Sequence, residues 1–127
     1  MSDKGYLKTR LQSIQYALEG IKQVLITQQN TRIHAVFTLA VFLLGFLLGI
    51  NRLEWITLLL TVGLVWAAEL VNTAVELMVD IVSPEQRPVA KICKDVGAGG
   101  VLVTAFISIL VGGLIFGPPI WRWITGF

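Results

Sequence analysis

The chain has 127 residues, a length typical of one domain, and 55% of its residues are hydrophobic whereas only 14% are charged. A soluble domain carries about 25% charged residues, so the composition argues against a soluble protein and indicates a membrane protein. The net charge of +2 is too small to indicate binding to nucleic acid. The only cysteine, Cys93, cannot form an intrachain disulfide, and no cysteine–histidine spacing indicates a zinc site.

The first predicted element is an amphipathic helix over about residues 6–27. Its apolar positions recur at spacings of three and four residues and occupy one arc about 80° wide, while charged and amide side chains occupy the other face. These apolar positions are Leu7, Leu11, Ile14, Leu18, Ile21 and Leu25. The pattern predicts a helix that lies in the membrane interface. A short coiled coil is the alternative.

Three membrane spans are predicted next, over about residues 33–50, 54–79 and 96–117. A polar turn, NRLE, separates the first two, and the loop SPEQRP precedes the third. At about 1.5 Å per residue the second span is about 37 Å long, which exceeds a hydrocarbon core of about 30 Å. Its C-terminal third is therefore expected near or beyond one membrane face. The tripeptide GPP at 117–119 is expected to end the third span.

Basic residues predict the orientation of this all-α chain. With three spans, the N-terminal helix and the loop after the second span lie on the same side of the membrane. Loops rich in lysine and arginine stay in the cytoplasm, so this side is predicted to be cytoplasmic. It holds Lys4, Lys8, Arg10, Lys22, Arg32, Arg87, Lys91 and Lys94, whereas the other side holds Arg52 and Arg122.

A polar stripe interrupts the end of the second span. In the segment AELVNTAVELMVD, the side chains of Glu69, Asn72, Glu76 and Asp80 fall within an arc of about 80° on a helix. Each ionisable residue in a span costs about 2.5–3.5 kcal/mol on insertion scales, so such residues usually serve a function. The segment KICKDVGAGG, which follows the loop, adds Lys91, Lys94 and Asp95 at the mouth of the third span.

These side chains supply the parts needed for phosphoryl transfer. Carboxylates bind Mg²⁺ together with substrate phosphates, a lysine attracts phosphate as a point charge, and a further carboxylate can deprotonate a hydroxyl. The sequence contains neither a Walker motif nor a protein-kinase catalytic loop. An ion or proton pathway is an alternative, as is a stripe that only forms hydrogen bonds with neighbouring helices.

The motif E-L-V-N-T-A-V-E-L-M-V-D at 69–80, followed by A-K-I-C-K-D-V-G-A-G-G-V-L at 90–102, resembles the prokaryotic-type diacylglycerol kinase family, which includes undecaprenol kinases. The resemblance implies one catalytic domain over residues 1–127 in the bacterial cytoplasmic (inner) membrane, with a cytoplasmic N-terminus and active site. It also implies a homotrimer whose subunits share active sites, and transfer of the γ-phosphate of Mg-ATP to a membrane lipid alcohol.

The resemblance leaves the acceptor open. Either diacylglycerol is converted to phosphatidic acid, or undecaprenol is converted to undecaprenyl phosphate. The alternative is an inactive family member that acts as a membrane binding or assembly subunit. The expected partners are ATP, the lipid alcohol, the bilayer and further copies of the chain, but not nucleic acid.

Motif positions imply a role for each site residue. Glu69 is expected to be the general base, Asn72 to orient the reacting groups, and Glu76 to hold Mg²⁺. Gln28 occupies the position at which the family often has a second metal-binding glutamate, and an amide oxygen is the weaker ligand. The expected nucleotide-binding residues are Tyr16, Glu76, Asp80, Glu85, Arg87, Lys94 and Asp95. The expected lipid-binding residues are Arg10, Glu69 and Ala98.

Overall fold

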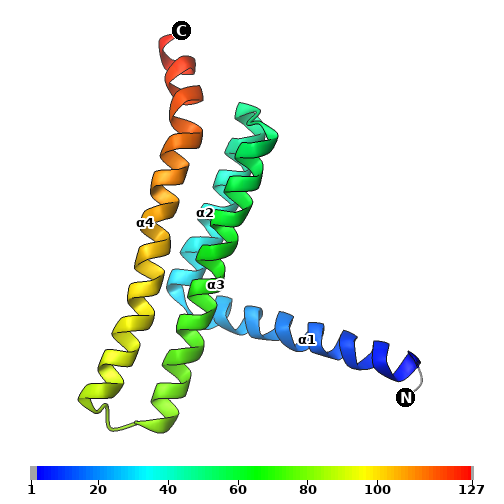
Figure 1. The fold of residues 1–127 in the computed structure, drawn as a ribbon, viewed down its shortest axis with the longest axis vertical. Coiled ribbons are helices and arrows are strands. Elements are labelled where there is room, and N and C mark those ends of the chain that lie inside the picture. The colour runs from blue at the N-terminus through cyan, green and yellow to red at the C-terminus, as the bar shows by residue number, and fades with distance from the viewer. Residues whose placement is uncertain (1–2, 127) are drawn as a thin grey trace.

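The computed structural model describes residues 3–126, and this part of the chain is folded into four helices. They are α1 (Asp3–Thr27), α2 (Gln29–Leu48), α3 (Arg52–Val82) and α4 (Pro88–Thr125). Helices α2, α3 and α4 run side by side, while α1 projects from their side at a steep angle (Figure 1). The predicted all-α fold with three candidate membrane spans is confirmed, since α2, α3 and α4 are each long and apolar enough to cross a membrane.

Local signals in the sequence explain the tight turn between α2 and α3. Helix α2 ends at Leu48 and is capped by Gly49, whose φ of 62° lies in the left-handed region that glycine adopts at little cost. Helix α3 begins with a capping box, in which the Asn51 side chain accepts from the Glu54 backbone N–H and the Glu54 carboxylate accepts from the Asn51 N–H, both at 2.9 Å. The predicted polar turn therefore positions α2 and α3 antiparallel.

Helix α4 is longer than the uncharged run that marked the third span. It begins at Pro88, a residue that is well suited to the first turn of a helix. It also continues through Pro118 and Pro119 to Thr125, so the helix does not end at GPP. Each proline keeps a φ that is compatible with a helix, but it removes one backbone donor and crowds the carbonyl group four residues earlier. Where the chain leaves the bilayer stays a prediction.

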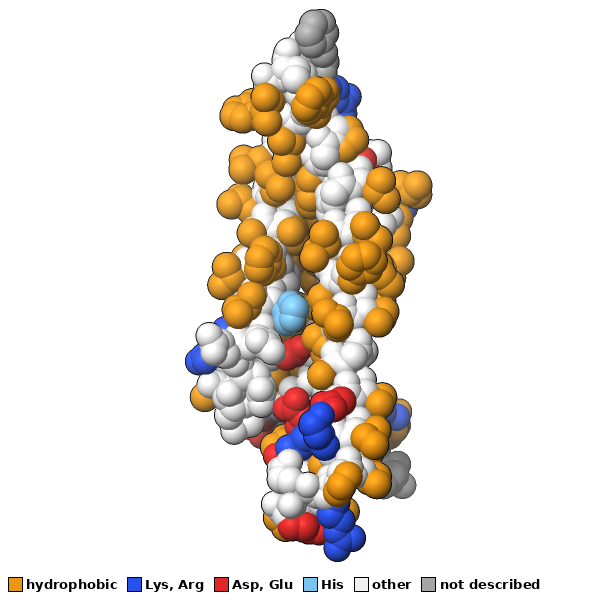
Figure 2. Space-filling view, turned by 90° about the vertical axis from the view of Figure 1, so that its left-hand side faces the viewer, with side chains coloured by type: hydrophobic (Ala, Val, Ile, Leu, Met, Phe, Trp, Pro, Cys, Tyr) orange, Lys and Arg blue, Asp and Glu red, His pale blue; other side chains and the backbone are white. Residues whose placement is uncertain are grey.

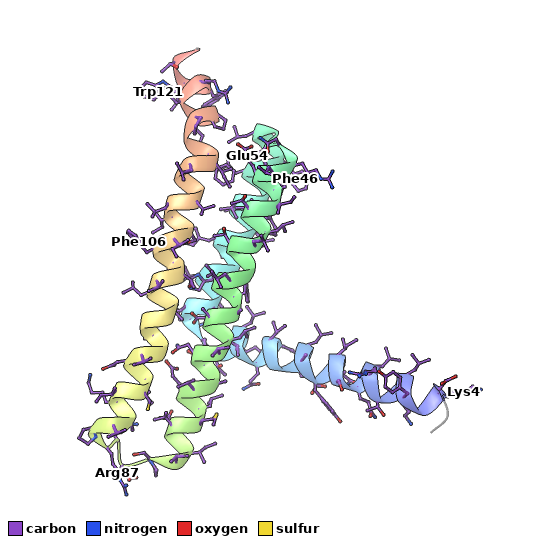
Figure 3. The ribbon with its side chains drawn as sticks, in the orientation of Figure 1. Lys4, Phe46, Glu54, Arg87, Phe106 and Trp121 are labelled. Atoms are coloured by element: carbon purple, nitrogen blue, oxygen red, sulfur yellow. The ribbon has the colours of Figure 1, made fainter. Side chains whose placement is uncertain are left out.

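The apolar core lies near the turn between α2 and α3. Ile50, Leu58, Ile115 and Phe116 are buried there against one another. Figure 3 shows Glu54 and Trp121 towards this end of the helices and Arg87 at the other. The charged side chains near Arg87 are therefore well separated from the core.

Helix α1 contributes little to this packing. Every residue of α1 is at least partly exposed, and its predicted apolar face is uncovered, with Leu11 67% exposed and Leu18 61% exposed. The sequence predicted a helix over about residues 6–27, and α1 covers Asp3–Thr27. Its placement in a membrane interface stays a prediction.

Candidate active site

The carboxylate of Glu69 is the most deeply buried acidic group of the polar stripe. Its residue is 3% exposed on α3, facing α2. The Thr31 hydroxyl, itself fully buried, donates to Glu69 Oε1 at 3.4 Å. His34 Nε2 lies 3.7 Å from Glu69 Oε2. Helix α2 thus holds the carboxylate through two residues one helical turn apart, which lie on the same face.

Two buried oxygen atoms in this region lack a hydrogen-bond partner within residues 3–126, namely Glu69 Oε2 and Asn72 Oδ1. Burying a polar atom without a partner is costly, so such atoms are expected to receive a donor from a bound group. An incoming hydroxyl or a hydrated cation would supply one of the missing interactions. The arrangement therefore suits a binding site better than a purely structural contact.

Asn72 connects the buried carboxylate to the rest of the stripe. Its Nδ2 donates to Glu76 Oε1 at 3.2 Å. On the other side, α4 approaches so closely that a Cβ atom added at Gly97 would collide with Asn72 Oδ1. Glycine at position 97 therefore lets Asn72 keep the orientation in which it donates to Glu76.

Nearer the loop between α3 and α4, opposite charges connect these two helices. Lys94 forms an ion pair with Asp80, whose Oδ1 also accepts from Gln86 Nε2 at 3.4 Å. Within α4, Lys91 Nζ lies 2.6 Å from Asp95 Oδ2. Figure 2 shows a large group of charged side chains below the single histidine, while hydrophobic side chains cover most of the surface above it. Polar and apolar regions thus meet close to His34.

Glu85 and Arg87 form a separate ion pair in the loop between α3 and α4, with Arg87 Nε 2.6 Å from Glu85 Oε1. Both side chains are largely exposed, at 49% and 75% respectively. Figure 3 places Arg87 at the tip of this loop. The pair therefore extends the charged region away from the buried end of the stripe.

The structure does not bring the predicted residues of α1 to the stripe. Tyr16 is 66% exposed, and the Arg10 guanidinium lies over the ring of Tyr6 at 4.9 Å. At 1.5 Å per residue, Tyr16 lies about 18 Å along α1 from the end of that helix near Gln28. Ala98 is on an exposed face of α4. Within one chain, Tyr16 and Arg10 therefore do not line the stripe.

The donor set fits a magnesium ion that is bound mainly by phosphates and water. Among residues 3–126, no three His, Cys, Asp or Glu side chains are grouped closely enough to hold a metal ion. Mg²⁺ usually keeps several waters and takes one or two protein carboxylates. Glu76 is partly exposed and can serve as that carboxylate, and the half-buried Gln28 lies at the break between α1 and α2.

An apolar groove has His34, the neighbour of the Glu69 carboxylate, in its lining. It has a volume of about 360 Å³ and lies among α2, α3 and α4. The residues along it include His34, Thr38, Leu58, Val62, Ser108 and Gly112. It is open on one side, and its lining is chiefly hydrocarbon. His34 therefore belongs both to this groove and to the surroundings of Glu69.

Three neighbours of the stripe were not predicted from the sequence as site residues. They are Thr31, His34 and Gly97, which contact or closely approach Glu69 and Asn72. Thr31 and His34 are spaced as neighbours on one helical face just before the first apolar run, which is a usable signal. The tight contact at Gly97 depends on how α3 and α4 are aligned along each other, and no local sequence pattern predicts that alignment.

Taken together, these features define a multi-pass membrane protein with a polar site at one end of its spans. The model of the family described as prokaryotic diacylglycerol kinase matches residues 15–116. The chain belongs to this family.

Three relatives illustrate the similarity. An undecaprenol kinase of Bacillus subtilis (strain 168) is 38% identical, over 92% of this chain and 95% of the relative. A diacylglycerol kinase of Synechocystis sp. (strain ATCC 27184 / PCC 6803 / Kazusa) is 40% identical over 87% of this chain, which spans 63% of that longer relative. A diacylglycerol kinase of Haemophilus influenzae (strain ATCC 51907 / DSM 11121 / KW20 / Rd) is 32% identical, over 84% of this chain and 91% of the relative.

Proposed function

We propose that this protein is a lipid kinase that transfers the γ-phosphate of ATP to the hydroxyl group of a membrane lipid alcohol, either diacylglycerol or undecaprenol. The family and the names of its relatives support this phosphotransferase activity. They do not favour the alternative of an inactive assembly subunit. The observation that carries the proposal for the site is the buried Glu69 carboxylate, whose Oε2 has no hydrogen-bond partner among the described residues.

Glu69 is the proposed general base. The acceptor hydroxyl donates to Glu69 Oε2, and its proton passes to the carboxylate as its oxygen attacks the γ-phosphorus. A bond forms between the lipid oxygen and phosphorus, while the bond between phosphorus and the β–γ bridging oxygen breaks and ADP leaves. A positioned base contributes about 10²–10⁴-fold to such a reaction. The Thr31 hydroxyl, which donates to Oε1, helps to fix the direction of Oε2.

Asn72 and Glu76 are proposed to hold the donor side of the reaction. Glu76, with a weaker contribution from Gln28, would bind the Mg²⁺ that neutralises charge on the phosphates. Asn72 donates to Glu76 Oε1 and so fixes the direction of this carboxylate. Glu69 and Glu76 would thereby serve different tasks, since Glu69 is buried beside α2 while Glu76 is partly exposed.

The charged residues nearer the loop are proposed to bind the nucleotide. The Lys94 ammonium lies close to the stripe, where it can attract phosphate oxygens. Asp80 holds Lys94 in place, and Asp95 is held by Lys91. The exposed pair of Glu85 and Arg87 would contact the outer part of the nucleotide.

A homotrimer in the bacterial inner membrane is proposed as the active form. The exposed Tyr16 and Arg10 of one chain lie away from its own Glu76, so sites shared between subunits would bring them to a nucleotide. The basic side of the chain supports a cytoplasmic N-terminus and a cytoplasmic active site. The uncovered apolar face of α1 supports its placement along the membrane interface.

The direct test is transfer of labelled phosphate from ATP by the purified protein in mixed micelles, with diacylglycerol and undecaprenol offered separately. Label in at least one lipid is expected, and the labelled lipid identifies the acceptor. Label in neither lipid, with protein that is folded and assembled, would contradict the proposed function.

A further inference from the structure

We propose that His34 positions the acceptor hydroxyl against Glu69, a role that rests on the proposed lipid kinase function and assigns a further residue to its acceptor site. His34 Nε2 lies 3.7 Å from the unpartnered oxygen of Glu69, and His34 also lines the apolar groove. It is therefore the residue at which a lipid in the groove would meet the general base.

The distance between the two side chains leaves room for a shared ligand. His34 Nε2 and Glu69 Oε2 are 3.7 Å apart, which is longer than the 2.7–3.2 Å of a direct N–H···O hydrogen bond. One hydroxyl oxygen placed about 2.8 Å from each atom satisfies both groups. In that position the hydroxyl donates to Glu69 Oε2 and accepts from the His34 Nε2–H. Its remaining lone pair is then available for the attack on phosphorus.

Hydrogen bonds next to His34 hold the backbone of α2 in place at this level. The Thr38 hydroxyl donates to the His34 carbonyl oxygen at 2.7 Å and accepts from the indole N–H of Trp66 at 2.9 Å. This chain of hydrogen bonds fixes one turn of α2 against α3 at the level of His34. The His34 side chain itself is 21% exposed, so a ligand can reach its Nε2 without a change of fold.

The groove provides the place for the rest of the acceptor. It extends from His34 to Leu58 and Gly112, on the side of the core. Between Glu69 and Leu58, helix α3 rises about 16 Å. A hydrocarbon chain that lies along this length would place its hydroxyl end at His34 and Glu69. A histidine that merely contacts lipid head groups would not need to line the groove and face a buried carboxylate at the same time.

The test compares His34→Gln, whose amide nitrogen can take the place of Nε2, with His34→Leu, which removes the donor. His34→Asn is the second comparison, because its shorter amide is polar but cannot reach the same position. Thr57→Val is the matched control, since the Thr57 hydroxyl donates to the Leu53 carbonyl of its own helix. Assembly and ATP binding are checked for each variant, and lipid kinetics are measured with the acceptor that the wild type uses.

The Leu and Asn variants are expected to lose about 10-fold or more in kcat/KM for the lipid, because one hydrogen bond to the reacting group is missing. Their KM for ATP is expected to stay unchanged, and the Gln variant to recover most of the loss. Three results would overturn the role of His34. They are equal activity of the Gln and Asn variants, wild-type lipid kinetics in the Leu variant, and a rise in the KM for ATP as large as the loss in kcat/KM for the lipid. A wild type that phosphorylates neither lipid would overturn the proposed function itself, and this role with it.

Discussion

The close contact between α3 and α4 at Gly97 predicts that Gly97→Ala impairs catalysis without destabilising the fold. A Cβ at this position collides with Asn72 Oδ1, so the Asn72 side chain must rotate and give up its 3.2 Å hydrogen bond to Glu76. A hydrogen bond to a charged group contributes about 1.5–3 kcal/mol, which corresponds to a loss of roughly 10- to 150-fold in turnover. Helix propensity alone would favour alanine by about 1 kcal/mol.

The assay is lipid phosphorylation at saturating ATP, with the thermal stability of the purified protein measured alongside. Gly113→Ala on the same helix is the control, because no atom lies within 4 Å of a Cβ added there. The double variant Gly97→Ala with Asn72→Ala tests the route of the effect. If Gly97→Ala acts through Asn72, the double variant is no slower than Asn72→Ala alone.

Two results would refute this reasoning. One is a Gly97→Ala enzyme with wild-type turnover, which would mean that Asn72 does not need its present orientation. The other is full additivity in the double variant, which would mean that Gly97 acts through a different neighbour.

Three further predictions concern the metal, the nucleotide and the orientation. Gln28→Glu is expected to lower the Mg²⁺ concentration for half-maximal activity several-fold by adding a carboxylate ligand; an unchanged magnesium titration would place this side chain away from the metal. Lys94→Met is expected to raise the KM for ATP about 10-fold, because a phosphate-binding charge is lost, and an unaltered KM would refute that role. Cys93 is the only cysteine and is exposed, so a membrane-impermeant maleimide is expected to label it in inside-out vesicles and not in intact cells. Labelling in intact cells would contradict the predicted topology.

The sequence predicted the helices and the polar stripe because both depend on local periodicity. The spacing of Glu69, Asn72 and Glu76 determines that they share one face of any helix, wherever that helix packs. The polar turn between α2 and α3 was likewise predictable, since Asn51 and Glu54 interact within four residues. These features need no knowledge of how the helices pack against one another.

Features that depend on helix packing were not predictable in this way. The contacts of Thr31 and His34 with Glu69 require α2 and α3 to align at one level, and the collision at Gly97 requires α3 and α4 to be close. The continuation of α4 through Pro118 runs against a local rule, because a proline inside a helix removes one hydrogen bond and crowds the preceding turn. The predicted role of Tyr16 in nucleotide binding stays a prediction, because its side chain is exposed on α1 and does not contact the stripe within one chain.

The most direct test of the central claim is the Glu69→Gln variant, which keeps a side-chain oxygen for the Thr31 hydroxyl but removes the base. ATP binding and the rate of phosphate transfer to the lipid are measured on the same preparation. If Glu69 is the general base, ATP binds with near wild-type affinity while transfer falls by roughly 10²–10⁴-fold. Transfer at the wild-type rate would contradict the assignment of the base to the buried end of the polar stripe.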